Sequence, residues 1–207
     1  MHVNNIIKQV NMKLSMIYKV RELNRKTLDM MYKMHVRSCI DYCLPVYGPS
    51  LSATQVNKLD QLQYRAARMA TMAMKFTSKE KIFNDLGWES IENRIKYLSI
   101  SLFHKIHIHG TRPLIRQCMP PINNYQNLTR SNKFYNTYSL KTAAFCNSFF
   151  PKISNLWNDL PFDLRNKDMV DFKMELGWLL KPPKIRLYSI GSKFGNSIHT
   201  QLRVGKS

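Results

Sequence analysis

The chain has 207 residues, of which 44% are hydrophobic and 11% aromatic, so it is long and apolar enough for a buried core and wholesale disorder is excluded. Lysine and arginine number 32 against 13 acidic residues, a formal net charge of +19 that favours a polyanionic partner, nucleic acid before membrane. No apolar run reaches the roughly 18 residues of a membrane-spanning helix, and the 7 glycines and 12 methionines are typical of helices rather than tightly turned β structure.

Two amphipathic helices are predicted at the start of the chain. Apolar side chains recur at helical spacing over residues 4–20 and again over about 27–43. Pro45 and the Gly48-Pro49 pair predict the end of the second helix. The apolar stripe expected along that helix consists of Leu28, Met31, Tyr32, His35, Cys39 and Tyr42.

The clearest helix is predicted over residues 53–74. Ser52 and Gln55 have the spacing of a capping box, in which the serine hydroxyl accepts from the Gln55 amide N–H and the glutamine side chain reaches back. The residues behind the box place one apolar, alanine-rich face along the helix. Three basic residues fall largely off that face, so we expect them to be exposed.

Two further helices follow. Thr77 and Glu80 have the spacing of a second capping box, which predicts a short helix that Gly87 ends. Ser90 then caps a helix over about 91–108. Proline and asparagine residues beyond it predict a connector.

The C-terminal part of the chain is expected to be less regular. Residues 129–141 lack a helical stripe and are predicted to hold short extended pieces. Apolar and aromatic residues predict a helix over about 142–158, which Pro151 must kink or split, and a last helix that ends near Leu180. Residues 184–207 show little periodicity, which predicts a mobile or lightly docked tail.

Together these elements predict a mainly α fold, a helical bundle followed by a smaller α-rich C-terminal region with few or no short strands. We expect residues 1–111 to form the bundle and 112–128 to form a connector. Residues 129–181 are expected to form the C-terminal helical region, and 182–207 a basic, flexible tail.

Basic residues are spread along the chain, and two stretches hold no acidic residue: the one between Glu92 and Asp159, and everything after Glu175. One interpretation is a solvated basic surface. The other is a surface that tracks phosphates, with interleaved aromatic side chains as stacking groups. Those aromatic residues are Tyr125, Phe134, Tyr135 and Tyr138.

Catalytic and metal-binding patterns are weak. His35, Cys39 and Cys43 share one helix face at i, i+4 and i+8, a pattern more typical of a core stripe than of a metal site. His104 and His107 are expected at the surface or facing phosphate, because no nearby carboxylate completes a metal site. No CxxC, P-loop, GxGxxG or GxSxG motif is present and the acidic residues are isolated, so we predict no active site and no cofactor.

The compartment is predicted from the cysteines and the N-terminus. The N-terminus lacks the basic-then-apolar order of a signal peptide. The four cysteines are therefore expected to be reduced thiols of an intracellular protein, in the nucleus or the cytoplasm, and not of a secreted one.

Several short motifs follow one another in a specific order. They are His2-Val3, Val36 to Tyr42, Leu44 to Gly48, Leu59 to Arg68, Leu86-Gly87-Trp88 with Glu92-Asn93-Arg94, Thr129-Arg130-Ser131, Phe149, Trp157-Asn158-Asp159-Leu160-Pro161, and Phe172 to Leu176. In this order and spacing, over about residues 2–180, the chain resembles the region that follows the polymerase palm in jockey-like non-LTR (LINE-type) retrotransposon reverse transcriptases.

The resemblance implies a C-terminal fragment, made of the thumb and the helical region after it. In such enzymes this part cradles the primer–template duplex and helps hold the element's RNA. The implied partners are RNA or an RNA–DNA duplex and the missing palm domain, with no membrane. The family's catalytic aspartates and the Mg they bind belong to the palm, upstream of residue 1, so no catalytic residue is carried over and the chain is not expected to be an enzyme by itself.

The charge pattern and the resemblance both point to contacts with a nucleic-acid backbone, which are independent of sequence and sensitive to salt. Arg130 is also expected to make a structural bond within its loop, and Trp88 and Trp157 are expected to be core anchors rather than base-stacking groups. The residues predicted to contact the backbone are Lys58, Arg65, Arg68, Arg94, Lys96, Arg112, Arg116 and Arg130.

Three alternative hypotheses stay open. The chain is an inactive remnant of a truncated element, an unrelated helical interaction protein whose charge aids solubility, or a metal-dependent enzyme that uses its histidines. The remnant predicts a molten or poorly soluble state. The interaction protein predicts no polyanion binding at physiological salt, and the metalloenzyme predicts stoichiometric zinc.

Overall fold

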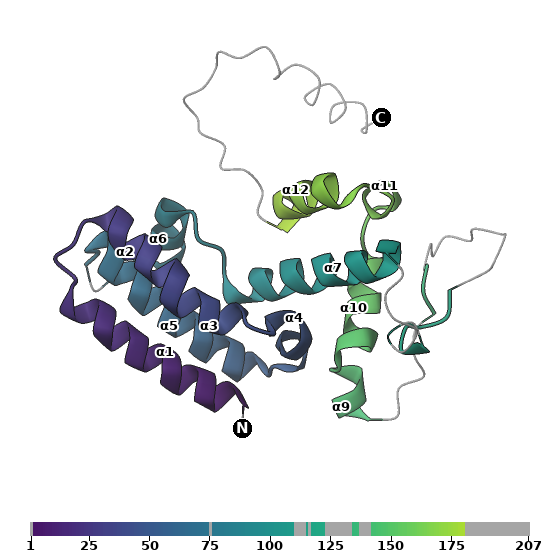
Figure 1. Cartoon of the computed structure of the whole chain (residues 1–207), viewed down its shortest axis with the longest axis horizontal. Coiled ribbons are helices and arrows are strands. Elements are labelled where there is room, and N and C mark those ends of the chain that lie inside the picture. Colours follow the sequence, from purple (N-terminus) through teal and green to yellow (C-terminus); the bar gives the residue numbers. More distant parts are fainter. Residues whose placement is uncertain are drawn as a thin grey trace, which may run out of the picture.

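The computed structural model describes residues 2–74, 76–109, 115, 117–122, 134–136 and 142–180. Helices make up 76% of the described residues, which confirms the mainly α prediction (Figure 1). The β structure within these ranges is an isolated antiparallel bridge between Ile122 and Tyr135. The tail predicted over 182–207, and most of the segments predicted over 112–128 and 129–141, lie outside the described residues.

The helices follow one another along the chain, with short turns between those of the N-terminal half. They are α1 (His2–Lys19), α2 (Arg25–Met31), the π-helical segment η1 (Tyr32–Arg37), α3 (Ser38–Asp41), α4 (Leu44–Tyr47), the 3-10 turn η2 (Gly48–Ser50), α5 (Ala53–Thr71), α6 (Lys79–Leu86), α7 (Ile91–His109), α9 (Ala143–Cys146), α10 (Phe149–Asn158), α11 (Phe162–Arg165) and α12 (Met169–Leu180).

Serine caps begin α5 and α6. At α5 the Gln55 amide N–H donates to Ser52 Oγ at 3.3 Å and the Ser52 amide N–H donates to Gln55 Oε1 at 3.0 Å, which confirms the predicted capping box. α6 begins one residue later than the predicted box. Ser78, and not Thr77, is its N-cap, with the hydroxyl accepting from the Lys81 amide N–H at 3.4 Å.

Left-handed residues end both helices of this pair. Met72 has φ of 51° after α5, and Gly87 has φ of 68° after α6, as predicted for that glycine. The next helix, α7, begins where predicted, because the Asn93 amide N–H donates to the Ser90 hydroxyl at 3.3 Å.

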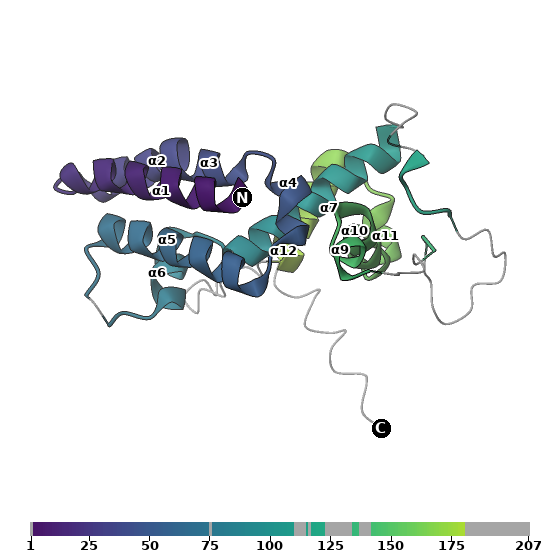
Figure 2. The same ribbon diagram turned by 90° about the horizontal axis from the view of Figure 1, so that it is seen from below.

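The N-terminal helices form two layers, seen edge-on in Figure 2. α1 and the continuous α2–η1–α3 helix lie side by side in one layer, and α5 and α6 form the other. α1 and α5 run in the same direction, whereas α2–η1–α3 returns antiparallel to α1 (Figure 1). The buried side chains between the layers include Val10, Leu14, Tyr32, Val36, Ile40, Leu59, Ala67 and Trp88.

In the helix predicted over 27–43, the face that packs against the core differs from the face that a period of 3.6 residues predicts. Its central segment, η1, is π-helical and has more residues per turn than an α-helix, so buried positions recur every four residues. His35 and Tyr42 are exposed, so their predicted place on the apolar stripe is wrong. The buried positions are Leu28, Tyr32, Val36, Ile40 and Leu44.

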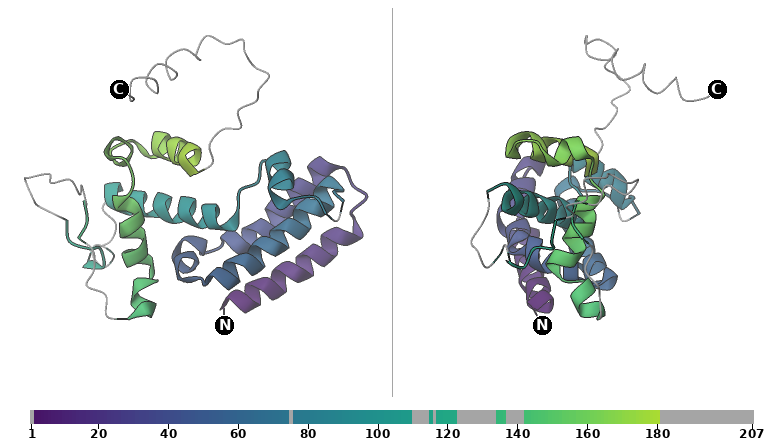
Figure 3. Two further views of the ribbon diagram at one scale, coloured as in Figure 1. Left: turned by 180° about the vertical axis from the view of Figure 1, so that it is seen from behind. Right: turned by 90° about the vertical axis from the view of Figure 1, so that its right-hand side faces the viewer.

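α7 runs from the N-terminal helices to the C-terminal ones (Figure 3), and it contributes to two hydrophobic cores. It contributes Ile95 to the N-terminal core and Ile100 and Phe103 to a second core with α10, α11 and α12. Trp157 is 0% exposed at the centre of the second core, 5.2 Å from Phe103 between ring centroids, which confirms its predicted anchoring role. The two cores therefore divide within α7, earlier in the chain than the connector predicted over 112–128.

The helix predicted over 142–158 is split, but not at its proline. α9 ends at Cys146 and α10 begins at Phe149, so the break falls at Asn147-Ser148. Pro151 lies in the first turn of α10, where its missing N–H removes no intrahelical hydrogen bond.

Candidate nucleic-acid interface

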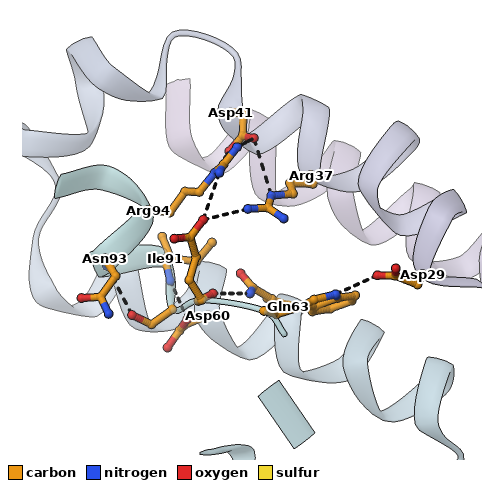
Figure 4. A network of polar contacts seen from close by, with 11 residues as sticks. Asp29, Arg37, Asp41, Asp60, Gln63, Ile91, Asn93 and Arg94 are labelled. Atoms are coloured by element: carbon orange, nitrogen blue, oxygen red, sulfur yellow. Dashed lines mark hydrogen bonds and ion pairs between the residues drawn. The ribbon is translucent and has the colours of Figure 1, made fainter. Parts of the chain in front are cut away.

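A network of ion pairs joins η1 and α3 to the start of α7 (Figure 4). Arg94 donates from Nε and Nη2 to the two oxygens of Asp41, at 3.1 and 2.5 Å, and from Nη1 to Glu89 Oε1 at 2.9 Å. Arg37 donates to the same Glu89 oxygen at 2.8 Å, and its Nε lies 3.7 Å from Asp41 Oδ2. The four side chains are 18% to 24% exposed, so water screens these pairs only partly.

The structure gives Arg94 carboxylate partners, whereas the sequence predicts a contact with a nucleic-acid backbone. Burial opposes its charge, but hydrogen bonds and Coulombic attraction from Asp41 and Glu89 outweigh burial and raise the pKa of Arg94 above its ordinary value. The two carboxylates already engage three of the five N–H donors of the guanidinium and offset its charge, which weakens its attraction for a phosphate. Lys96, one turn further along α7, pairs with Glu92 at 2.8 Å and lies at the surface.

A second group of polar contacts holds the turn between α6 and α7. Asp60 Oδ1 accepts from the Ile91 amide N–H at 3.1 Å, at the positive end of the α7 dipole, and its other oxygen pairs with Lys79. Gln63 Nε2 donates to the Glu89 carbonyl at 2.7 Å. Two side chains of α5 therefore fix the turn from which α7 begins.

Trp88 in this turn is the anchor that the sequence predicts. It is 3% exposed and stacks on Tyr32 with ring centroids 4.0 Å apart. Its indole N–H donates to Asp29 Oδ1 at 2.8 Å. The buried ring and its polar tip thus tie the turn to α2 and η1.

A different surface, at the contact between α1 and α5, carries basic side chains that pair with no carboxylate of the described residues. Arg65 reaches from α5 to α1, where its Nη1 donates to Asn11 Oδ1 at 3.0 Å. Lys58 lies two turns before Arg65 on the same side of α5, and Lys8 lies about one turn before Asn11 on α1. Lys8, Lys58 and Arg65 are exposed. We call Lys8, Asn11, Lys58 and Arg65 the α1/α5 basic surface.

No carboxylate of either helix offsets the charge of the α1/α5 basic surface. α1 contains no aspartate or glutamate. Asp60 is the acidic residue of α5, and it is 8% exposed and bonded toward α6 and α7, on the other side of the helix. The local potential is therefore positive, and charge-assisted hydrogen bonds to phosphate oxygens suit it.

Arg68 lies one turn beyond Arg65, toward the turn between α5 and α6. Its Cζ is 5.8 Å from the centroid of the Tyr64 ring, which is fixed by a 2.7 Å hydrogen bond from its hydroxyl to the Thr77 carbonyl. The Arg68 Nε is buried and has no hydrogen-bond partner in the described part of the chain. Arg68 is therefore half-buried beside the α1/α5 basic surface rather than part of it.

Other predicted contact and stacking residues cannot be placed. These are Arg112, Arg116, Arg130, Tyr125 and Tyr138, which lie outside the described residues.

In the C-terminal half, His104 and Tyr135 lie in the core, and His107 and Phe134 are half-buried. His104 is 0% exposed and stacks on Phe172 with centroids 3.7 Å apart, so its predicted surface position is wrong. His107 is half-buried, with Nδ1 2.7 Å from the Tyr135 hydroxyl. Burial lowers the pKa of His107 and raises the pKa of Tyr135 to about 12. Tyr135 is 1% exposed and Phe134 packs beside it, so Tyr135 cannot serve as a stacking group.

The described residues contain no group of three or more histidine, cysteine or acidic side chains placed to hold a metal ion. Among the residues of the His35 pattern, Cys39 accepts instead from Lys13 Nζ at 2.6 Å. None of the described helices combines the length and the hydropathy needed to cross a bilayer.

Two residues of the α1/α5 basic surface, Lys8 and Asn11, are absent from the sequence-based site. The sequence signal that points to them is the complete lack of acidic residues in α1. No protein-family model, curated protein or solved structure matches the chain.

Proposed function

We propose that the chain is a C-terminal, non-catalytic part of a retrotransposon RNA-directed DNA polymerase, and that it binds the backbone of RNA or of a primer–template duplex through α1 and α5. The observation that carries the proposal is the α1/α5 basic surface. Three exposed basic side chains lie there on two parallel helices with no acidic residue of either helix facing them.

The arrangement suits a regular polyanion. Arg65 uses one donor on Asn11, which leaves the rest of its guanidinium for phosphate oxygens. Lys58 adds a point charge about 10.5 Å away along the helix, a distance set by the rise of seven residues. Contacts of this kind position a backbone and read no sequence.

The residues that carry the resemblance support the same proposal because they make structural contacts. Asp41, Trp88 and Arg94 belong to the motifs: Asp41 and Arg94 join α3 to α7, and Trp88 ties the turn before α7 to α2. Trp157 and Asn158 belong to the closing motif; Trp157 is buried, and Asn158 exchanges hydrogen bonds with the backbone of Tyr135. The motif residues therefore serve packing, as expected for a region without catalytic residues.

The test is the salt dependence of binding to an RNA–DNA duplex, measured by fluorescence anisotropy. Replacing Lys58 and Arg65 together with alanine is expected to weaken binding and to lessen the slope of log K against log salt by about 2, because each lost phosphate contact lessens it by about 1. The matched control replaces Lys105 and Lys173, two exposed lysines on α7 and α12, and removes the same charge.

The control variant is expected to keep the wild-type slope. Equal slopes for the Lys58/Arg65 variant and the wild type would refute the assignment of the surface. No binding of the wild type at physiological salt would refute the function and favour the unrelated interaction protein.

A further inference from the structure

The other flank of α1 faces α3 instead of α5. A groove of about 460 Å³ opens between these two antiparallel helices and is lined by Asn5, Ile6, Gln9, Ser38, Cys39 and Tyr42. α1 and α3 lie side by side in both views of the bundle (Figures 1 and 2). The volume is that of a small-molecule site, and most of the groups that line it are polar but uncharged.

The amide side chains of the groove are free to pair. Asn5 and Gln9 are one turn apart on the same side of α1, and both are exposed. Neither amide makes a hydrogen bond to the part of the chain that the structure describes. Each amide offers a donor and an acceptor together, the combination that pairs with the N6 and N7 edge of adenine and with similar base edges.

Tyr42 supplies an aromatic face at the other wall. Its side chain is 72% exposed, whereas Ile40 and Leu44, two residues before and after it, are buried. The backbone beneath it is fixed, because the Tyr42 amide N–H donates to the Ser38 carbonyl at 3.1 Å and Cys43 turns the chain in the left-handed conformation, with φ of 56°. An exposed ring on a fixed backbone can stack on a planar ligand at little entropic cost.

The charges around the groove favour a ligand attached to an anion. No carboxylate lines it. Asp41, next to Tyr42 in the chain, is bonded to Arg94 on the other side of the helix. At the groove the Lys13 ammonium group donates to Cys39 Sγ at 2.6 Å, so a positive charge stands beside the neutral amides.

Resting on the proposed function, we propose that the groove between α1 and α3 binds an unpaired nucleobase of a single strand. The base stacks on Tyr42 and pairs with Asn5 and Gln9, while the phosphates of the same strand follow the α1/α5 basic surface. The two sites are separated by α1 alone, a helix about 10 Å across. A base inside a duplex is stacked and paired on both sides, so it cannot enter the groove.

The experiment compares two probes on the full chain by fluorescence anisotropy: single-stranded oligoadenylate, and a blunt RNA–DNA duplex. Tyr42→Ala is expected to weaken binding of oligoadenylate about tenfold, or about 1.4 kcal/mol, and to leave duplex binding unchanged. Tyr42→Phe keeps the ring and is expected to bind within about twofold of the wild type. Gln9→Ala is expected to weaken oligoadenylate binding alone.

The matched control is Phe162→Ala, which removes an aromatic side chain that is 62% exposed on α11, outside the groove. The groove is refuted if Tyr42→Ala binds oligoadenylate as the wild type does, or if it weakens both probes equally. The proposed function fails separately, when the wild type binds neither probe. If the Lys58/Arg65 variant loses duplex binding while Tyr42→Ala changes nothing, the function holds and the groove alone is wrong.

Discussion

Replacing Arg94 with alanine removes three hydrogen bonds that join α3 and the Trp88 turn to α7. Breaking a buried ion pair costs about 3–5 kcal/mol, and breaking an exposed pair costs about 0–1 kcal/mol. Arg94 is 22% exposed, and Arg37 remains to compensate Asp41 and Glu89 in part. We therefore expect Arg94→Ala to lower the free energy of unfolding by about 2–3 kcal/mol, between the two limits.

The assay is thermal or urea unfolding followed by circular dichroism. For a chain of this size a loss of about 2–3 kcal/mol lowers Tm by roughly 5–10 °C. The control is Lys96→Ala in the same helix, which removes an exposed i, i+4 pair with Glu92 and is expected to cost no more than about 0.5 kcal/mol. The two variants differ in net charge from the wild type by the same amount, so only the bonding differs.

A result opposite to this one would restore the sequence-based assignment of Arg94. If Arg94→Ala unfolded at the wild-type temperature and lessened the salt slope of duplex binding, the guanidinium would contact phosphate and not Asp41. If Arg94→Ala lost stability and kept the wild-type salt slope, the role of Arg94 would be its ion pairs with Asp41 and Glu89.

Two further substitutions test the local structure. Gly87→Ala is expected to lower the free energy of unfolding by about 1–2 kcal/mol, because a residue with a side chain disfavours φ of 68°, although nothing lies within 4 Å of the added Cβ. Urea unfolding measures this loss, and a loss below about 0.3 kcal/mol would contradict the left-handed cap. Burial lowers the pKa of His107 in the folded chain, so the unfolded chain binds a proton at this imidazole more readily than the folded one. The contribution of neutral His107 to stability is therefore complete above about pH 6.5 and falls as the pH drops below that value. His107→Gln is expected to lessen the loss of Tm between about pH 7.5 and pH 5.5, and an unchanged loss would contradict the burial of this imidazole.

The sequence predicts the elements whose signals are local. The helix predicted over 53–74 is observed as Ala53–Thr71, because the Ser52 cap and an uninterrupted apolar face depend only on neighbours in the chain. The face of the second helix is predicted wrongly, because a period of 3.6 residues does not describe the π-helical segment Tyr32–Arg37. The shift moves His35 out to solvent.

The surroundings of two residues singled out in the sequence depend on partners far away in the chain. Arg94 looks like a free cation until Asp41, 53 residues earlier, is brought to it by the fold. His104 looks like a surface histidine until Phe172 stacks on it and the Lys167 carbonyl lies 3.1 Å from its Nε2. Neither contact leaves a periodic or local trace in the sequence.

The positive surface on α1 and α5 is a consequence of where the acidic residues are used. With 13 acidic residues against 32 basic ones, most positive charges must remain unpaired. Three acidic side chains of the bundle lie where helices are joined: Asp41 and Glu89 join α3 to α7, and Asp60 joins α5 to α6 and α7. These carboxylates are therefore not available to the α1/α5 basic surface. Lys8, Lys58 and Arg65 face solvent there without a neutralising neighbour on their own helices. Packing and electrostatics are thus one arrangement, in which acidic side chains used to join helices leave a positive potential on the α1/α5 basic surface.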